Sequence, residues 1–308
     1  MTKFDTIIKS LFTKFLSEET KEKSERIIVY IAIGSFFLHL LLIFLTDIGV
    51  IDLSDYSDLL TSPIAAIYTP FSFILVYEVY LLIYYLPKSI TTYIGKQYEI
   101  ITLIIIRRIF KDLSKLELTS DWFQTKNDLQ FTYDIIAAIV LFFLIFLFYK
   151  LSADRVLTTK SAEKLILEVK QFIKLKKLIA TFLVPVLLVL AVYSFGQWIW
   201  TNFFSISQLV DSIKSVNNIF FDEFFTVLIL VDVLLLLFSF VHTDEFYKVI
   251  RNSGFIISTI LIRLSFGVEG LVNIGLITAA VLFGVIILAI HNQYEKKLTG
   301  KSIEATNS

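Results

Sequence analysis

Charged residues inside apolar segments are the residues of this 308-residue chain best placed to do chemistry. Glu78 and Arg108 lie in successive apolar segments, and Asp232 and Arg263 occupy matching places 154 and 155 residues later. Counting about 1.5 Å per helical residue from the basic ends puts each acid and its arginine at about the same membrane depth. The spacing therefore predicts two intramembrane acid–arginine pairs, Glu78 with Arg108 and Asp232 with Arg263, with Arg107 beside the first.

Two roles fit such pairs. Ionisable residues within a membrane typically mark an ion pathway or gate. A neutralised pair can also simply join two helices, because removing one partner would leave the other charge in a medium of low dielectric constant. Since each acid has a partner at its own depth, the structural role has at least as much support as the pathway role.

Three other polar residues fall within or near the apolar segments. His39 is the only histidine well inside one, and a hydrogen bond between helices is expected of it more than proton relay. Glu99 shares a short segment with the two arginines. Asp134 stands near the outer end of its segment, so it is predicted to be interfacial.

Several classes of protein are excluded or disfavoured by composition and motifs. The absence of cysteine rules out disulfides, thiolate metal sites and cysteine nucleophiles. Phosphate-binding loops, dinucleotide fingerprints and hydrolase motifs are missing, so neither enzymatic activity nor a cofactor or metal is expected. Lys plus Arg and Asp plus Glu number 28 each, which gives no net field for nucleic acid.

The elements that must position these residues are membrane helices. The chain is 56% hydrophobic with a mean hydropathy of +0.76, typical of an all-α, polytopic integral membrane protein whose main partner is the lipid bilayer. Six segments have the roughly 20 residues that a bilayer requires. They are 27–46, 64–86, 131–149, 178–200, 221–241 and 270–291. Two shorter apolar segments lie between them, at 98–110 and 254–266.

The distribution of positive charge predicts that all eight segments cross. With the N-terminus inside, the inner pieces hold 21 Lys and Arg and the outer pieces hold 4. If the two short segments only dip into the membrane, the division becomes 17 against 11, contrary to the positive-inside rule. We therefore predict eight transmembrane helices in the plasma (inner) membrane, with both termini cytoplasmic.

A tandem repeat organises these segments. The stretch from ILVYEVYLLIYY to IIIRRIF lies over the stretch from LILVDVLLLLFSF to ILIRLSF with a one-residue gap, which predicts two parallel four-helix units. The predicted regions are a cytoplasmic amphipathic helix (1–26), the first four-helix unit (27–150), a basic amphipathic linker (151–177), the second four-helix unit (178–292) and a cytoplasmic tail (293–308).

Small residues on the last segment predict a close helix contact. Gly275 with Ala279 and Ala280 with Gly284 each form a small-xxx-small pair, which favours close approach of two backbones. The contact is either between the two repeats or between subunits of a homo-oligomer.

The second half also resembles a known family. The acid Asp232, the arginine Arg263 late in a short third span, and a fourth span with the basic end Lys296 and Lys297 resemble the phosphate-starvation-inducible E family of four-span bacterial membrane proteins. The first half looks like a divergent copy. The resemblance implies a bacterial inner-membrane protein linked to phosphate stress, and it brings no established molecular activity.

Two functions are consistent with these observations. The first is a channel or transporter for a small ion that uses the acid–arginine pairs. The alternative is a non-transporting membrane scaffold or regulatory protein that recruits partners through its basic cytoplasmic helices.

Overall fold

The computed structural model describes residues 3–50, 63–113, 116, 126–153, 163–203, 216–241, 245–268 and 270–307. Every regular element within these ranges is a helix, which confirms the predicted all-α class. In chain order the elements are α1 (Lys3–Leu16), α2 (Glu18–Asp47), the 3-10 helix η2 (Pro63–Ile67), α3 (Tyr68–Tyr85), α4 (Ile90–Leu113), α5 (Lys126–Ala153), α6 (Glu163–Phe203), α7 (Val216–Val241), α8 (Phe246–Ser265) and α9 (Gly270–Asn307).

Within the described ranges, five stretches of helix are long and apolar enough to cross a membrane. They are Thr6–Asp47, Asp128–Ala153, Gln171–Tyr193, Glu223–Val241 and Gly270–Lys297, and Thr69–Tyr85 forms a shorter apolar helix. The structure thus agrees with a membrane protein. Helices α4 and α8, which contain the two short predicted segments, are less apolar along their length.

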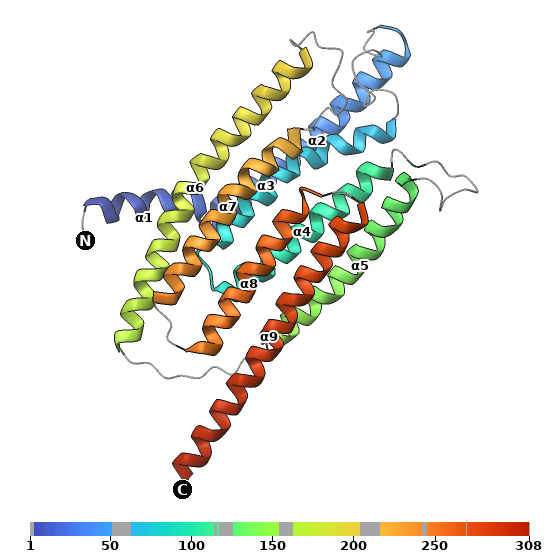
Figure 1. Cartoon of the computed structure of the whole chain (residues 1–308). Coiled ribbons are helices and arrows are strands. Elements are labelled where there is room, and N and C mark those ends of the chain that lie inside the picture. Colours follow the sequence, from blue (N-terminus) through green and yellow to red (C-terminus); the bar gives the residue numbers. More distant parts are fainter. Residues whose placement is uncertain are drawn as a thin grey trace.

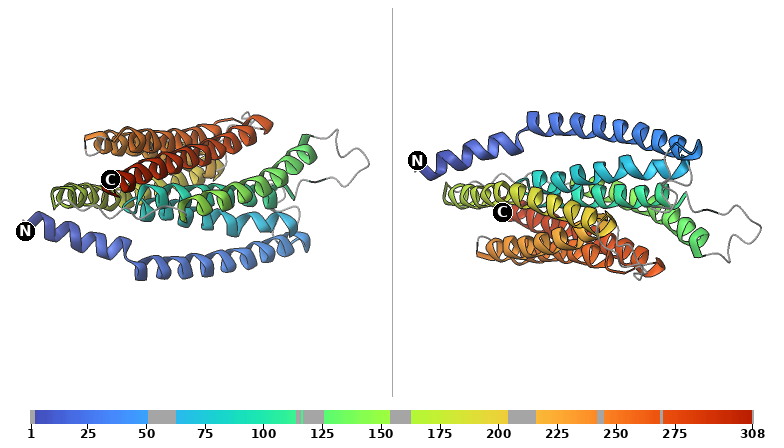
Figure 2. Two further views of the ribbon diagram at one scale, coloured as in Figure 1. Left: turned by 90° about the horizontal axis from the view of Figure 1, so that it is seen from below. Right: turned by 90° about the horizontal axis from the view of Figure 1, so that it is seen from above.

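The helices form a bundle with α4 near its middle. Helices α2 to α9 run roughly along one direction, whereas α1 crosses the end of the bundle and α9 extends past the others to the C-terminus (Figure 1). Seen from below or from above, α2 lies on one side of the bundle and α8 on the opposite side (Figure 2). Helix α4 packs against α3, α5 and α8, so it connects the two halves of the chain.

The surface of the bundle is apolar, unlike that of a soluble protein, and several charged side chains are buried. Large apolar side chains such as Phe142 and Val192 are more than 70% exposed. Charged side chains such as Glu78, Asp134 and Asp232 are at most 3% exposed. Buried charges are rare unless they are paired, and exposed apolar area of this extent is suited to lipid. The bundle therefore buries paired charges within a largely apolar core and presents an apolar surface.

Three predicted region boundaries fall inside continuous helices. Helix α2 begins at Glu18 rather than 27, α6 runs without a break across 177 and 178, and α9 continues through 292 and 293. These junctions are rich in Glu and Lys, which favour helix, and contain no proline. The end of the apolar stretch is therefore not the end of the helix. Residues 154–162 of the predicted linker lie outside the described residues.

Tyrosines of α3 fix the junction between α1 and α2 through hydrogen bonds. Ser17 caps α2 by accepting a 3.1 Å hydrogen bond from the Thr20 amide. The Tyr80 hydroxyl donates to the Phe15 carbonyl at 2.8 Å, and Tyr84 donates to Glu18 at 2.6 Å. The predicted amphipathic segment is helical, and contacts with α6 and α3 fix its position.

Candidate functional site

Among the described residues, the most completely buried ion pair joins α7 to α8. The Arg263 Nη1 atom lies 2.7 Å from Asp232 Oδ2, and the two side chains are 2% and 0% exposed. Tyr93 donates a 2.9 Å hydrogen bond to Asp232 Oδ1, and Arg263 Nη2 donates to Gln97 Oε1 at 2.8 Å. The predicted pairing of Asp232 with Arg263 is therefore present, and α4 of the first half completes it.

Helical periodicity explains why these side chains meet. Tyr93 and Gln97 are four residues apart on α4, as are Thr259 and Arg263 on α8, so each pair occupies one helix face. The Thr259 hydroxyl lies 3.4 Å from Asp232 Oδ2 and donates mainly to the Ile256 carbonyl at 2.9 Å. The two faces enclose Asp232 from both halves of the chain. We call Tyr93, Gln97, Asp232, Thr259 and Arg263 the central cluster.

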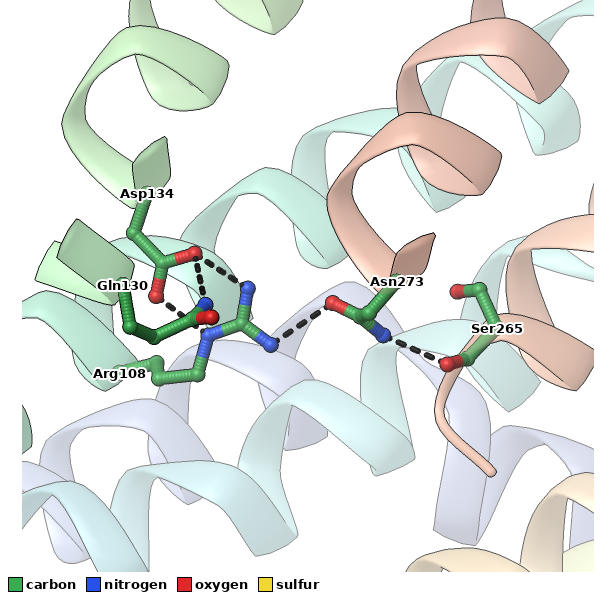
Figure 3. Close-up of polar contacts among 5 residues, drawn as sticks. All are labelled: Arg108, Gln130, Asp134, Ser265 and Asn273. Atoms are coloured by element: carbon green, nitrogen blue, oxygen red, sulfur yellow. Dashed lines mark hydrogen bonds and ion pairs between the residues drawn. The ribbon is translucent and has the colours of Figure 1, made fainter. Parts of the chain in front are cut away.

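A second cluster forms around Arg108, near the ends of α4, α5 and α9 (Figure 3). Arg108 binds Asp134 bidentately, with Nε–Oδ2 and Nη2–Oδ1 distances of 2.6 Å, and Gln130 donates to the same carboxylate at 3.0 Å. The Arg108 Nη1 atom donates to Asn273 Oδ1 at 2.8 Å, and Asn273 donates to the Ser265 carbonyl at 2.6 Å. One guanidinium thereby joins α4, α5 and α9.

The predicted pairing of Glu78 with Arg108 is wrong. Glu78 instead pairs with Arg107 at 2.5 Å, and Arg107 also donates to the Phe71 carbonyl at 3.0 Å. Successive residues of a helix point about 100° apart, so Arg107 faces α3 while Arg108 faces α5 and α9. At the position that matches Arg107, the second half has Ile262. Comparison of the two halves therefore could not show that Arg107, and not Arg108, is the partner of Glu78.

The interfacial assignment of Asp134 is wrong as well. Its side chain is 0% exposed, although Arg108 retains 27% exposure. A carboxylate so close to a helix end escapes water only because α4 and α9 cover it. Breaking a buried ion pair of this kind costs about 3–5 kcal/mol.

The other predicted polar residues lie apart from these two clusters. His39 Nδ1 and the Thr69 hydroxyl form a short hydrogen bond between α2 and α3, which is the interhelical contact expected of this histidine. Glu99 contacts Lys96 at 2.7 Å and accepts a 2.5 Å hydrogen bond from Tyr149. It therefore belongs to the N-terminal half of α4 rather than to the arginines.

The two small-residue pairs of α9 behave differently. Ala280 and Gly284 are buried, and a Cβ at Gly284 would lie 1.8 Å from the Tyr98 hydroxyl of α4. Gly275 and Ala279 face outward, and a Cβ at Gly275 would meet nothing within 4 Å. The predicted close contact thus joins the two halves at the second pair.

A polar face of α8 connects these features along the bundle. The buried residues of α8 include Arg251, Asn252, Ser258, Thr259, Arg263 and Ser265. At one end Arg251 contacts His291 at 3.0 Å and Asn252 donates to Ser239 at 2.8 Å. In the middle Tyr98 bonds Ser258 at 2.7 Å. Polar groups from α4, α7 and α9 therefore meet this face at successive levels.

Sequence reasoning missed the uncharged members of both clusters. Tyr93, Gln97 and Asn273 carry no charge, so hydropathy did not distinguish them. One signal was available, because the polar residues of α8 recur at helical spacing opposite Ile257, Leu261 and Leu264. Among the described residues, no group of three His, Asp or Glu could hold a metal ion.

Comparisons with known proteins return no relative. No protein-family model, curated protein or solved structure matches the chain.

Proposed function

We propose that the chain is an inner-membrane protein with eight spans that moves a small ion along the polar face of α8. The observation that carries this proposal is the row of buried polar groups between α8 and the helices α4, α7 and α9. Ionisable groups are costly in lipid and often mark an ion pathway, and this face carries Arg251 and Arg263 with polar residues between them. The central cluster, which closes the row with an ion pair, is the gate in this proposal.

The exposed face of α8 supports its role as a span. Ile250, Ile257, Leu261 and Leu264 form one stripe on that face, and each is at least 36% exposed. Neighbouring helices cover most of the polar side chains that lower the average hydropathy of α8, and the partly exposed Lys248 lies at its N-terminal end. Helix α4 is enclosed by α3, α5 and α8, so it needs little lipid-facing surface. Both helices can therefore cross the membrane, and both termini would then be cytoplasmic.

The two four-helix units remain part of this proposal. The fourth helices of the two units are α5 and α9. Aligning Asp134 of α5 with Asn273 of α9 places equivalent positions of these helices 139 residues apart. Both side chains bind Arg108, so equivalent positions of the two units meet at one guanidinium. A parallel repeat around an axis along the membrane normal would bring equivalent positions together in this way.

Introduced thiols test the number of spans, because the chain has no cysteine of its own. Ala153→Cys, exposed at the end of α5, should react only with a reagent that reaches the cytoplasm. Val268→Cys, 40% exposed in the turn between α8 and α9, should react with an impermeant reagent added outside. Labelling of both sites from one side would refute the eight-span arrangement.

Ion flux into liposomes tests the pathway. Purified protein should conduct at least one of proton, potassium, chloride and phosphate, and Asp232→Asn should reduce that flux at least tenfold. Glu78→Gln is the matched control, since it neutralises an intramembrane acid whose arginine faces α3 instead of α8. Flux should persist in this control.

The outcome separates transport from a scaffold role. Absence of flux for all four ions in folded protein would reject the proposal and favour the scaffold that recruits partners at its cytoplasmic helices. An equal loss of flux in Asp232→Asn and Glu78→Gln would assign both acids to folding.

A further inference from the structure

Three lysine side chains gather where α1, α3 and α6 pack together. Lys88, in the turn after α3, has its Nζ atom 5.5 Å from the centre of the Tyr84 ring. Lys177 of α6 has its Nζ atom 5.1 Å from the centre of the Phe12 ring of α1. Between them, Lys176 Nζ donates to the Lys88 carbonyl at 3.1 Å. We call Lys88, Lys176 and Lys177 the junction patch.

The positive charge of the junction patch has no matching acid. Among the residues that the structure describes, none of the three lysines forms an ion pair, and Glu18, the acid bonded to Tyr84, is paired with Lys21 at 3.1 Å. Lys176 is 5% exposed, and its ammonium has three N–H donors but a single described oxygen acceptor. A buried ammonium without a counter-ion is costly. The patch is therefore suited to an anion that comes from outside the chain.

The place of the patch along the chain puts it at the level of lipid headgroups. Lys88 comes two residues after the predicted span 64–86, and Lys176 and Lys177 come directly before the predicted span 178–200. Basic pockets between membrane helices at the cytoplasmic surface typically bind anionic headgroups. The three ammonium groups thus lie where the phosphate of a lipid in the inner leaflet would be.

Helix α1 places apolar side chains beside the patch. It crosses the end of the bundle (Figure 1), and Phe12 and Phe15 pack against the core. Ile7 and Leu11 remain 52% and 39% exposed, and Lys14 is exposed on the same helix. Apolar and basic side chains on a helix of this kind are typical of the interface between headgroups and acyl chains. A lipid could therefore cover Leu11 with an acyl chain while its phosphate reaches the lysine over the neighbouring Phe12.

We propose that the junction patch binds the phosphate group of an anionic phospholipid. Lys88 and Lys177, whose side chains are exposed, contact the phosphate, and the buried Lys176 completes its hydrogen bonds. Aromatic rings hold these ammonium groups in place through cation–π contacts, which lowers the cost of ordering them. Because α3 belongs to the first half and α6 to the second, the bound lipid joins the two halves. The site does not depend on ion transport.

Thermal unfolding measures this binding. The melting temperature of the purified full-length protein in a neutral detergent would be followed as phosphatidylglycerol or phosphatidylcholine is added. A ligand that binds only the folded state raises the melting temperature according to its concentration over its Kd. Phosphatidylglycerol should stabilise the protein at a lower concentration, because no choline neutralises its phosphate.

Substitutions identify the lysines that are responsible. Lys88→Gln and Lys177→Gln should each raise the apparent Kd for phosphatidylglycerol about fivefold, and the double variant about 25-fold. Lys88→Arg should retain binding, since it keeps the charge. Lys176→Met should also weaken binding. Lys150→Gln is the matched control, because this exposed lysine lies in the last turn of α5, outside the patch, and it should bind phosphatidylglycerol as the wild type does.

The results can overturn the inference in three ways. Equal stabilisation of the wild type by the two lipids would show that no anionic headgroup is recognised. A Kd raised as much by Lys150→Gln as by Lys88→Gln would show a general attraction to the basic surface. If inorganic phosphate at the same concentration stabilises as strongly as phosphatidylglycerol, the site takes free phosphate and the lipid is rejected. Should Lys176→Met not fold, the two exposed lysines decide.

The same experiments separate this site from the proposed transport. A response to phosphatidylglycerol that is lost in the double variant supports the lipid site whether or not the protein conducts ions. Ion flux in a protein that does not distinguish the two lipids would keep the transport proposal and reject the lipid site.

Discussion

Replacing Gly284 by alanine should strongly destabilise the contact between the two halves of the bundle. The added Cβ would lie 1.8 Å from the Tyr98 hydroxyl, so that oxygen must move about 1.6 Å to reach the 3.4 Å of an ordinary contact. Tyr98 is fully buried, with its ring edge-on to Phe148 at 5.2 Å, and it cannot simply turn away. Movement would also stretch its 2.7 Å hydrogen bond to Ser258.

The size of the effect follows from these two losses. Overpacking a close-packed interior typically costs about 1–3 kcal/mol, and loss of the hydrogen bond adds about 0.5–1.5 kcal/mol. Gly284→Ala should therefore lower the free energy of unfolding by about 1.5–4.5 kcal/mol. The loss is measured by circular dichroism as the helices unfold in mixed micelles of increasing SDS fraction.

Two further variants make this prediction refutable. Gly275→Ala, on the same helix with open space around its Cβ, should cause no loss, because alanine favours helix over glycine. In a Tyr98→Phe background, Gly284→Ala should cost about 1 kcal/mol less, since the overlapping oxygen is gone. A stability of Gly284→Ala within 0.5 kcal/mol of the wild type, or a cost unaffected by Tyr98→Phe, would show that α4 and α9 do not approach as described.

Three other substitutions test the ion pairs and an interhelical bond by the same SDS titration. Glu78→Leu should cost about 3–5 kcal/mol because Arg107 loses this carboxylate, and adding Arg107→Leu should recover most of the loss; no recovery would argue against the pair. Arg108→Lys should cost about 1–3 kcal/mol, since one ammonium cannot bind an acid bidentately and reach the amide of α9; an unchanged stability would contradict the bridge. Thr69→Val should cost about 0.6 kcal/mol through its bond to His39, and a gain in stability would count against that bond.

The sequence predicted well those features that depend on charge and periodicity. A charged residue inside an apolar segment demands a partner, so the pairing of Asp232 with Arg263 followed from their depth and matching positions. Helical class followed from the length and hydropathy of the segments. The interhelical role of His39 likewise required only that a polar side chain in an apolar helix find a partner.

Features that depend on the rotation and neighbours of a helix could not be predicted in this way. Depth alone could not decide between Arg107 and Arg108 as the partner of Glu78, because both lie at nearly the same level. Asp134 was assigned to the interface from its position along α5, but its burial depends on α4 and α9 beside it. Gln97 and Asn273 have neutral amides, so only the packed bundle reveals what they bind.

The polar face of α8 has a consequence for how the chain is made. In the eight-span arrangement, α8 leaves the ribosome with one side that lipid cannot solvate, and the helices that cover this side are α4, α7 and α9. Two of them precede α8 in the chain, but α9, the 38 residues from Gly270 to Asn307, follows it. Until α9 has been synthesised, only α4 and α7 can cover the polar face, so α8 cannot reach its final packing before the helix that follows it has been made.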